Sequence, residues 1–270
     1  EENRVGGVIL NQVSGDSHTA YLKEAIEPLK IPVLGAIGKQ DELRWNERHL
    51  GLTASQEREL ASEDDLASLA EELLDLDQIA ALAGEVEQPA FDAEPQEQLD
   101  LSIALAQDEA FHFYYPQNLE RFRNITPFSP IHDRSIPDAN LVVIGGGFPE
   151  VYEEQLRENR EMAAELTERR IYAECGGLMF LTMLGLIPGQ VQMTKRLQNF
   201  GYCEAGEGAR GHEFHYSTWT AEESDANLWP VRRRRTGTQR MEGFRNERIT
   251  ATYVHSNWAT NEFLMPNASD

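Results

Sequence analysis

The alternation of strand and helix patterns predicts an α/β protein with a doubly wound, mainly parallel sheet. Residues 5–13 have the apolar pattern of a buried strand, an amphipathic helix pattern follows Ser17, and residues 31–37 form a second apolar run. Because a strand, a helix and a strand in close succession make a βαβ unit, the two strands are expected to be parallel. The same alternation returns after residue 100, where a second domain is predicted.

The N-terminal part, residues 1–85, is predicted to be a domain of its own. Ser17 is expected to cap its first helix, and residues 62–86 have helical periodicity, beginning with an S-x-x-D capping pattern at Ser62. Residues 86–99 are acidic and contain Pro, which is typical of a linker. The apolar stripe expected on the first helix consists of Tyr21, Leu22, Ala25, Ile26 and Leu29.

Residues 100–270 are predicted to form the second domain, in which strands and helices first alternate and strands then dominate. Strands are expected at 101–106, 141–144, 170–174, 199–204, 213–220 and 248–255, and helices near 117–124, 151–168 and 178–184.

The composition indicates a globular protein of the reducing cytoplasm. Hydrophobic residues make up 40% of the chain, and no apolar run is long enough to cross a bilayer. Two cysteines cannot supply a disulfide framework. The net charge of −22 argues against nucleic acid as a partner, and a polyanionic substrate would need a local basic patch. Residues 232–235, four consecutive arginines, are either that patch or a solvated loop.

Cys175 is the most informative residue for chemistry. It follows a predicted strand and precedes Gly176, Gly177 and an apolar helix, which is the pattern of a strand-to-helix turn that exposes a nucleophile. At a helix N-terminus the dipole and free N–H groups are expected to lower the thiol pKa. Cys203 lies inside a predicted strand and is expected to be a core residue.

His255 is the candidate general base, because it ends a predicted strand and can reach the end of the strand that precedes Cys175. His212 and His215 flank Glu213 and Phe214, but a separation of three places the two rings on opposite faces of a strand. No metal site is therefore expected.

The glycines at 145–147 follow a buried strand and precede a helix. They lack the last glycine of a dinucleotide-binding loop, and the alternative is a close-approach turn whose N–H groups stabilise an oxyanion.

Eight segments along the chain resemble the cobyrinic acid a,c-diamide synthase family of cobalamin-pathway amidotransferases. The most specific are AECGGLMFL at 173–181 and GHEFHYS at 211–217. The others are GVILNQV at 7–13, IPVLGAI at 31–37, ERHLGL at 47–52, DEAFHFYYPQNLE at 108–120, GGGFPEVYEEQL at 145–156 and TYVHSNW at 252–258.

The resemblance implies a class I, flavodoxin-like glutamine amidotransferase domain preceded by the end of a P-loop-type ATP-binding domain. Its implied reaction is the ATP-, Mg²⁺- and glutamine-dependent amidation of the a and c carboxylates of cobyrinic or hydrogenobyrinic acid; the glutaminase step itself needs no cofactor. Siblings acting on cobyric acid or nickel-sirohydrochlorin, and a non-catalytic interaction domain, stay open as alternatives. So does pairing with a second copy of the chain.

The family pattern implies Cys175 as nucleophile, His255 as base, and N–H groups of Gly146, Gly147 and Gly176 as oxyanion donors. His212, Glu213 and His215 become candidates for substrate contact, with a structural role on the strand equally open. Many class I relatives have an acid two residues after the histidine, where this chain has Asn257.

The departure from the family lies at the front of the chain. No G-x-x-x-x-G-K-[ST] motif occurs in the sequence, so the P-loop of the ATP-binding domain is expected upstream of Glu1. Asn11, at the end of the first strand, is either a remaining adenine contact or a turn-forming residue.

Overall fold

The computed structural model describes residues 5–40, 47–48, 51–52, 62–84, 98–221 and 229–260. The chain divides into two compact units, unit 1 from Glu1 to Ala93 and unit 2 from Glu94 to Asp270. The division falls inside the segment 86–99 that the sequence assigns to a linker. Residues 85–97 of that segment lie outside the described residues.

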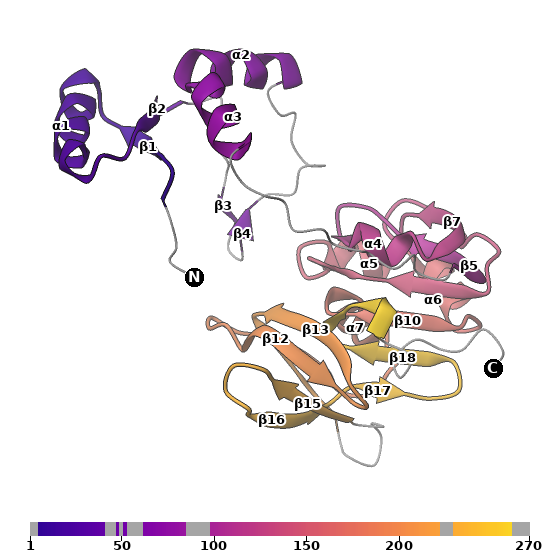
Figure 1. Ribbon diagram of the computed structural model, residues 1–270. Coiled ribbons are helices and arrows are strands. Elements are labelled where there is room, and N and C mark those ends of the chain that lie inside the picture. Colours follow the sequence, from indigo (N-terminus) through magenta and orange to yellow (C-terminus); the bar gives the residue numbers. More distant parts are fainter. Residues whose placement is uncertain are drawn as a thin grey trace. The chain divides into compact units, whose positions relative to one another are not determined.

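Unit 1 contains the predicted βαβ arrangement (Figure 1). Strands β1 and β2 pair in parallel in a two-stranded sheet, which confirms the expected strand direction. Its elements are β1 (Val8–Val13), α1 (Asp16–Ile26), η1 (Glu27–Leu29), β2 (Val33–Gly38), β3 (Glu47–Arg48), β4 (Gly51–Leu52), α2 (Glu63–Leu73) and α3 (Leu76–Gly84).

Two details expected for the start of unit 1 are wrong. The N-cap of α1 is Gly15 rather than Ser17, and none of the helix residues is buried. Tyr21, expected on the apolar stripe, is 69% exposed. Strand β1 buries only Leu10 and Val13, because its sole partner among the described strands is β2.

The predicted capping box of α2 is confirmed. The Ser62 side chain accepts a hydrogen bond from Asp65 N, and the Asp65 carboxylate accepts one from Ser62 N. The helix expected to continue to residue 86 is interrupted at Leu74, whose extended backbone forms a bridge with Gly35 of β2. Leu74 thus pairs with β2 instead of continuing the helix, and α3 begins after the interruption.

Unit 2 is built on a six-stranded sheet, the main sheet, which confirms the predicted fold class. Five of its strands are parallel, and their spatial order β7-β5-β8-β10-β18 corresponds to 2-1-3-4-5 in chain order, the flavodoxin-like arrangement. They are β5 (Leu99–Ala106), β7 (Phe122–Phe128), β8 (Leu141–Ile144), β10 (Ile171–Glu174) and β18 (Ile249–Thr252), with β17 (Phe244–Arg245) antiparallel at one edge.

The helices of unit 2 are shorter than the sequence predicts. The helix expected at 117–124 is a single turn, because the chain enters β7 at Phe122. The helix expected at 151–168 is divided at Asn159, whose side chain accepts from Met162 N and donates to Pro130 O and Asp133 O. The helices are α4 (Pro116–Leu119), α5 (Glu153–Glu158), α6 (Arg160–Leu166) and α7 (Gly176–Met183).

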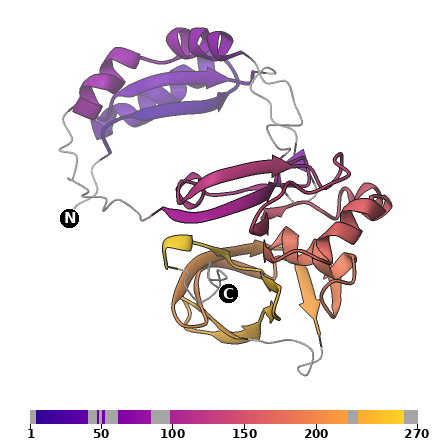
Figure 2. The same cartoon turned by 90° about the vertical axis from the view of Figure 1, so that its right-hand side faces the viewer.

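An antiparallel five-stranded sheet, the second sheet, forms the rest of unit 2 (Figure 2). Its order is β16 (Gln239–Glu242), β15 (Trp229–Arg233), β12 (Asn199–Ala205), β13 (Ala209–His215) and β19 (His255–Ser256). The strand expected at 213–220 is divided in two, because the chain leaves this sheet after His215. The remaining elements are β6 (Phe111–Phe113), β9 (Gly146–Gly147), β11 (Gln190–Met193), β14 (Ser217–Thr220) and η3 (Trp258–Thr260).

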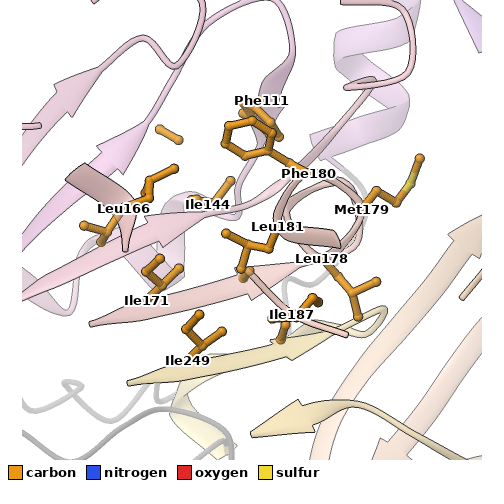
Figure 3. Packing of buried hydrophobic residues seen from close by; sticks show 14 of the residues in the cluster. Phe111, Ile144, Leu166, Ile171, Leu178, Met179, Phe180, Leu181, Ile187 and Ile249 are labelled. Carbon is orange, nitrogen blue, oxygen red and sulfur yellow. The ribbon is translucent and has the colours of Figure 1, made fainter. Parts of the chain in front are cut away.

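The two faces of the main sheet are covered by different layers. Alternate residues such as Val142 and Ile144 pack against α5, α6 and α7, and Figure 3 shows Leu178 and Leu181 of α7 in this cluster. Their neighbours, such as Val143 and Tyr172, pack against the second sheet. Strand β8, with all four residues buried, is therefore apolar on both faces, as its sequence predicts.

No helix in the described part of the chain is long and apolar enough to cross a membrane.

Candidate active site

Cys175 sits at the sharp turn between β10 and α7. Its backbone has φ 51° and ψ −104°, an uncommon conformation for a residue with a side chain, and it is the N-cap of α7. Its N–H donates to Thr252 O on the neighbouring strand β18, at 2.7 Å, which holds the turn at the carboxyl edge of the main sheet. Strain of this kind concentrates at functional sites.

The glycines on both sides of this turn lie too close to their neighbours to carry side chains. A Cβ on Gly177 would overlap the carbonyl oxygen of Ile144, and one on Gly147 would overlap that of Ala110. A Cβ on Gly176 would lie 3.0 Å from Gly147 N. The start of α7 is thus packed directly against the three-glycine turn at residues 145–147.

The His255 ring lies against the same turn from another side. A Cβ on Gly146 would overlap Cε1 of the ring and lie 3.2 Å from both ring nitrogens. The ring also stacks on His212, with 4.9 Å between ring centroids and 22° between planes. Since Gly176 and His255 both contact this one turn, the turn brings the residue after Cys175 and the candidate base into the same site.

One detail expected for His255 is wrong. Strand β18 ends at Thr252, and His255 belongs to β19, which pairs with β13 in the second sheet. The chain changes sheets between the two strands because Tyr253 N is bonded to the Glu242 carboxylate and Val254 N to the Thr252 hydroxyl, rather than to the main-sheet ladder.

Glu174 holds β19 in place and was missed by the sequence reasoning. Its Oε1 accepts hydrogen bonds from the hydroxyls of Tyr172 and Ser256, from Ser256 N and from the Trp258 indole. The carboxylate thereby ties the residue before Cys175 to the residue after His255. The sequence did offer a signal for this role, because Glu174 is a charged residue at the end of an otherwise apolar strand.

His212 and His215 point to opposite faces of β13. Glu213, which follows His212 in the chain, is buried. His212 contacts His255 and shares a 2.7 Å hydrogen bond with the Tyr115 hydroxyl. His215 stacks on Tyr253, and the Glu213 carboxylate is paired with Arg240. No group of three or more metal-ligating side chains is found among the described residues.

The expectation that the Cys175 thiol has a lowered pKa is wrong. Burial raises the pKa of the thiol to about 12, because desolvation disfavours the thiolate. The N–H of Gly176 hydrogen-bonds the sulfur and lowers the pKa, as the helix N-terminus predicted, but it is outweighed. The carboxylates of Glu150, Glu174 and Glu213 raise the pKa further.

Burial has the opposite effect on the imidazole. It lowers the pKa of His255 to about 3, with further lowering by His212 and His215 and partial compensation by Glu213. Near neutral pH the site therefore holds a neutral thiol and a neutral imidazole. A neutral imidazole has one nitrogen free to accept a proton, which is what a general base requires.

Several backbone donors near Cys175 are already engaged. The N–H of Gly145 donates to the Tyr114 hydroxyl, that of Phe148 to Ala110 O, and that of Gly177 to Gly145 O. Gly176 N–H is directed at the sulfur.

Glu150 is a second residue that the sequence reasoning missed. Glu174 and Glu213, the other two carboxylates that act on Cys175, have several hydrogen-bonding partners. Among the described residues, Glu150 bonds only its own backbone N–H, and burial raises its pKa. An uncompensated carboxylate beside a candidate nucleophile is suited to receiving a cationic group of a substrate.

In unit 1, Asn11 lies within β1 and is exposed. Its Oδ1 accepts a hydrogen bond from Gln12 N at 2.9 Å, and β1 continues to Val13, so Asn11 does not end the strand as expected.

Comparison with known proteins identifies the family. The model of the CobB/CobQ-like glutamine amidotransferase domain matches residues 102–263. The chain belongs to this family. The match begins within β5 and extends beyond His255, and it therefore includes the whole of the site described above.

Nearly the whole chain, unit 1 included, aligns with curated proteins. A cobyrinate a,c-diamide synthase of Salmonella typhimurium is 37% identical over 94% of this chain and 64% of its own length. Proteins of the same name from Listeria monocytogenes and Methanothermobacter thermautotrophicus are 36% and 34% identical, over 96% and 94% of this chain and 66% and 64% of their own lengths. The chain thus spans slightly less than two thirds of these relatives.

Among solved structures, a glutamine amidotransferase of Thermotoga maritima has a TM-score of 0.41 at 14% identity. The alignment covers 60% of this chain and 76% of that protein.

The protonation of His255 can be followed directly by NMR of labelled histidine. We expect the His255 ring to stay neutral between about pH 5 and 8, with its signals assigned by the His255→Asn variant. The unfolded chain takes up this proton near pH 6.5 and the folded chain does not. His255 therefore contributes stability that is present above pH 6.5 and is lost as the pH falls towards 3. A folded-state titration midpoint near 6.5 would contradict the buried, neutral ring.

Proposed function

We propose that unit 2 hydrolyses glutamine to glutamate and ammonia, with Cys175 as nucleophile and His255 as general base. The observation that carries the proposal is the packing of the three-glycine turn between the ring of His255 and the residue after Cys175. The membership of the glutamine amidotransferase family supports it.

In the proposed mechanism the Cys175 sulfur attacks the carboxamide carbon of glutamine while His255 accepts the thiol proton. Because thiol and imidazole are both neutral at rest, proton transfer accompanies the attack rather than preceding it. Once the C–S bond has formed and the C–N bond breaks, His255 returns the proton to the departing ammonia. Water, deprotonated by His255, then hydrolyses the thioester and regenerates the thiol.

The negative charge on the carboxamide oxygen is assigned to backbone donors. Gly176 N–H is one, since it already points at the sulfur, and Gly146 or Gly147 in the turn supplies the other. Each donor of an oxyanion hole is typically worth about 3–4 kcal/mol in the transition state. Glu150 is assigned to the α-ammonium group of glutamine.

For the complete reaction we propose that the ammonia amidates the a and c carboxylates of a corrinoid such as cobyrinic or hydrogenobyrinic acid. Support comes from relatives named cobyrinate a,c-diamide synthase that align with 94–96% of this chain. ATP with Mg²⁺ would activate the carboxylate as an acyl phosphate. A cytoplasmic location agrees with a thiol nucleophile that must stay reduced.

The described residues of unit 1 do not fit an ATP–Mg²⁺ site. The sequence has no phosphate-binding loop motif, and the side-chain oxygen of Asn11 is engaged by Gln12. We therefore assign the activation step to none of the described residues of unit 1.

Replacing the two proposed catalytic residues tests the glutaminase assignment. Cys175→Ala should abolish ammonia release from glutamine, and His255→Ala should lower kcat by about 10²-fold or more. His212→Ala and His215→Ala should be milder, since neither ring needs to take the thiol proton. A glutamine-mimicking electrophile followed by peptide mapping should label Cys175. Labelling chiefly at Cys203, or a His215→Ala defect larger than that of His255→Ala, would sink the assignment.

Glu150→Gln tests the ammonium contact. The KM for glutamine should rise by about tenfold, the effect of losing a charge-assisted hydrogen bond, with a smaller change in kcat. The pKa of Cys175, measured from the pH dependence of alkylation, should fall because a neighbouring negative charge is removed. Glu154→Gln, the same change at an exposed position of α5, is the control. An unchanged KM would remove Glu150 from the glutamine site.

A further inference from the structure

The plane of the His255 ring is set by packing rather than by a hydrogen bond. Among the described residues no side chain hydrogen-bonds this ring. Its neighbours are the Gly146 backbone and the rings of Phe113 and His212. Asn257, two residues further on, is exposed, and its Oδ1 accepts a hydrogen bond from a nearby backbone N–H. The orientation of the candidate base therefore depends on the groups that its ring touches.

His212 is the cross-strand partner of His255. The two residues are in register in the antiparallel pair of β13 and β19, and their rings stack with 4.9 Å between centroids and 22° between planes. Partners in an antiparallel ladder project to the same side of the sheet, so the stack follows from the register. The two backbones also approach closely, because a Cβ on Gly211 would overlap the carbonyl oxygen of His255. Since β13 lies between β12 and β19 in the second sheet, the His212 backbone is held from both sides.

The ring of His212 is held in turn by Tyr115. The Tyr115 hydroxyl shares a 2.7 Å hydrogen bond with His212 Nδ1, and the two rings meet edge to face with 5.9 Å between centroids. Tyr115 is the N-cap of α4. In that helix, Asn118 donates to Ser256 O at 2.8 Å and accepts from Trp258 N at 3.0 Å. Helix α4 is thereby tied to β19 and η3, the part of the chain that carries the candidate base.

A stacked neighbour suits a general base because it leaves the edge of the ring free. Both nitrogens of an imidazole lie on that edge, so contact with a ring face fixes the plane without occupying the nitrogen that accepts the proton. Burial lowers the pKa of His212, as it lowers that of His255. Near neutral pH both rings are therefore neutral, and they stack without charge repulsion.

We propose that His212, held by the Tyr115 hydroxyl, is a positioning residue that orients the imidazole of His255 for its reaction with Cys175. This inference rests on the proposed function and adds a residue role to it. It assigns His212 to orienting the base rather than to contacting substrate. A misplaced reacting group slows the chemical step and leaves substrate binding unchanged, because orientation counts in the transition state.

The test is the steady-state release of ammonia from glutamine by variants that keep the thermal unfolding transition of the wild type. His212→Ala should lower kcat by about tenfold and change the KM for glutamine by less than about twofold. His212→Phe restores a flat ring over the base and should recover kcat to about threefold below the wild type. His18→Ala, which removes an exposed histidine from α1 of unit 1, is the matched control and should keep wild-type kcat and KM.

Tyr115→Phe tests the link between the hydroxyl and the stacked ring. Removing the hydroxyl should lower kcat by about threefold, the effect of one lost hydrogen bond. In the double variant of Tyr115→Phe and His212→Phe, the hydroxyl has no bond left to lose. Its kcat should therefore stay about threefold below the wild type, whereas independent residues would give about ninefold.

Several results would overturn the inference. These are wild-type kcat in His212→Ala, a His212→Phe variant no more active than His212→Ala, and losses that multiply in the double variant. A raised KM for glutamine with unchanged kcat in His212→Ala would instead assign His212 to substrate contact. Failure of the proposed function would appear separately, as a wild-type chain that releases no ammonia or as full activity in His255→Ala, and would overturn both.

Discussion

The site depends on the absence of side chains at four glycines. Gly146, Gly147, Gly176 and Gly177 lie where a single methyl group would meet a ring or a backbone atom. These contacts let the turn at 145–147 lie between α7 and β19, elements that belong to different layers of unit 2. A side chain at any of these positions would force the start of α7 or the His255 ring away from the turn.

Burial then determines how the site works. The same desolvation raises the pKa of the Cys175 thiol and lowers that of His255, so both groups rest in their neutral forms. This arrangement differs from a preformed thiolate–imidazolium pair, in which the negative charge exists before substrate arrives. In the proposed mechanism charge develops only during attack, where the Gly176 N–H can stabilise it. The buried carboxylate of Glu174 fixes β19 relative to β10 through three hydrogen bonds, two from Ser256 and one from Trp258, a role that needs no acid after the histidine.

The sequence predicts the parts of the fold that local patterns determine. A fully apolar β8 and a strand followed by Cys-Gly-Gly correctly indicated a buried parallel sheet and the turn at Cys175. The Ser62 capping box was equally readable. The remaining element boundaries were determined by long-range contacts that local patterns do not reveal. Leu74 leaves its helix to pair with Gly35, and His255 joins the second sheet because Glu242 takes the N–H of Tyr253. The Cys175 pKa was mispredicted because the helix terminus is visible in the sequence and the depth of burial is not.

The most direct test of this account is the glutaminase activity of Gly146→Ala. The added methyl group would occupy the position of the His255 ring, whereas Gly84→Ala, which has nothing within 4 Å, is a matched control for the same change. The account predicts that kcat/KM for glutamine falls by about 10²-fold in Gly146→Ala, the loss expected for a displaced general base, with a retained thermal unfolding transition. Gly84→Ala should keep wild-type activity. Wild-type kcat/KM in a folded Gly146→Ala protein would contradict the claim that this turn sets the position of the base.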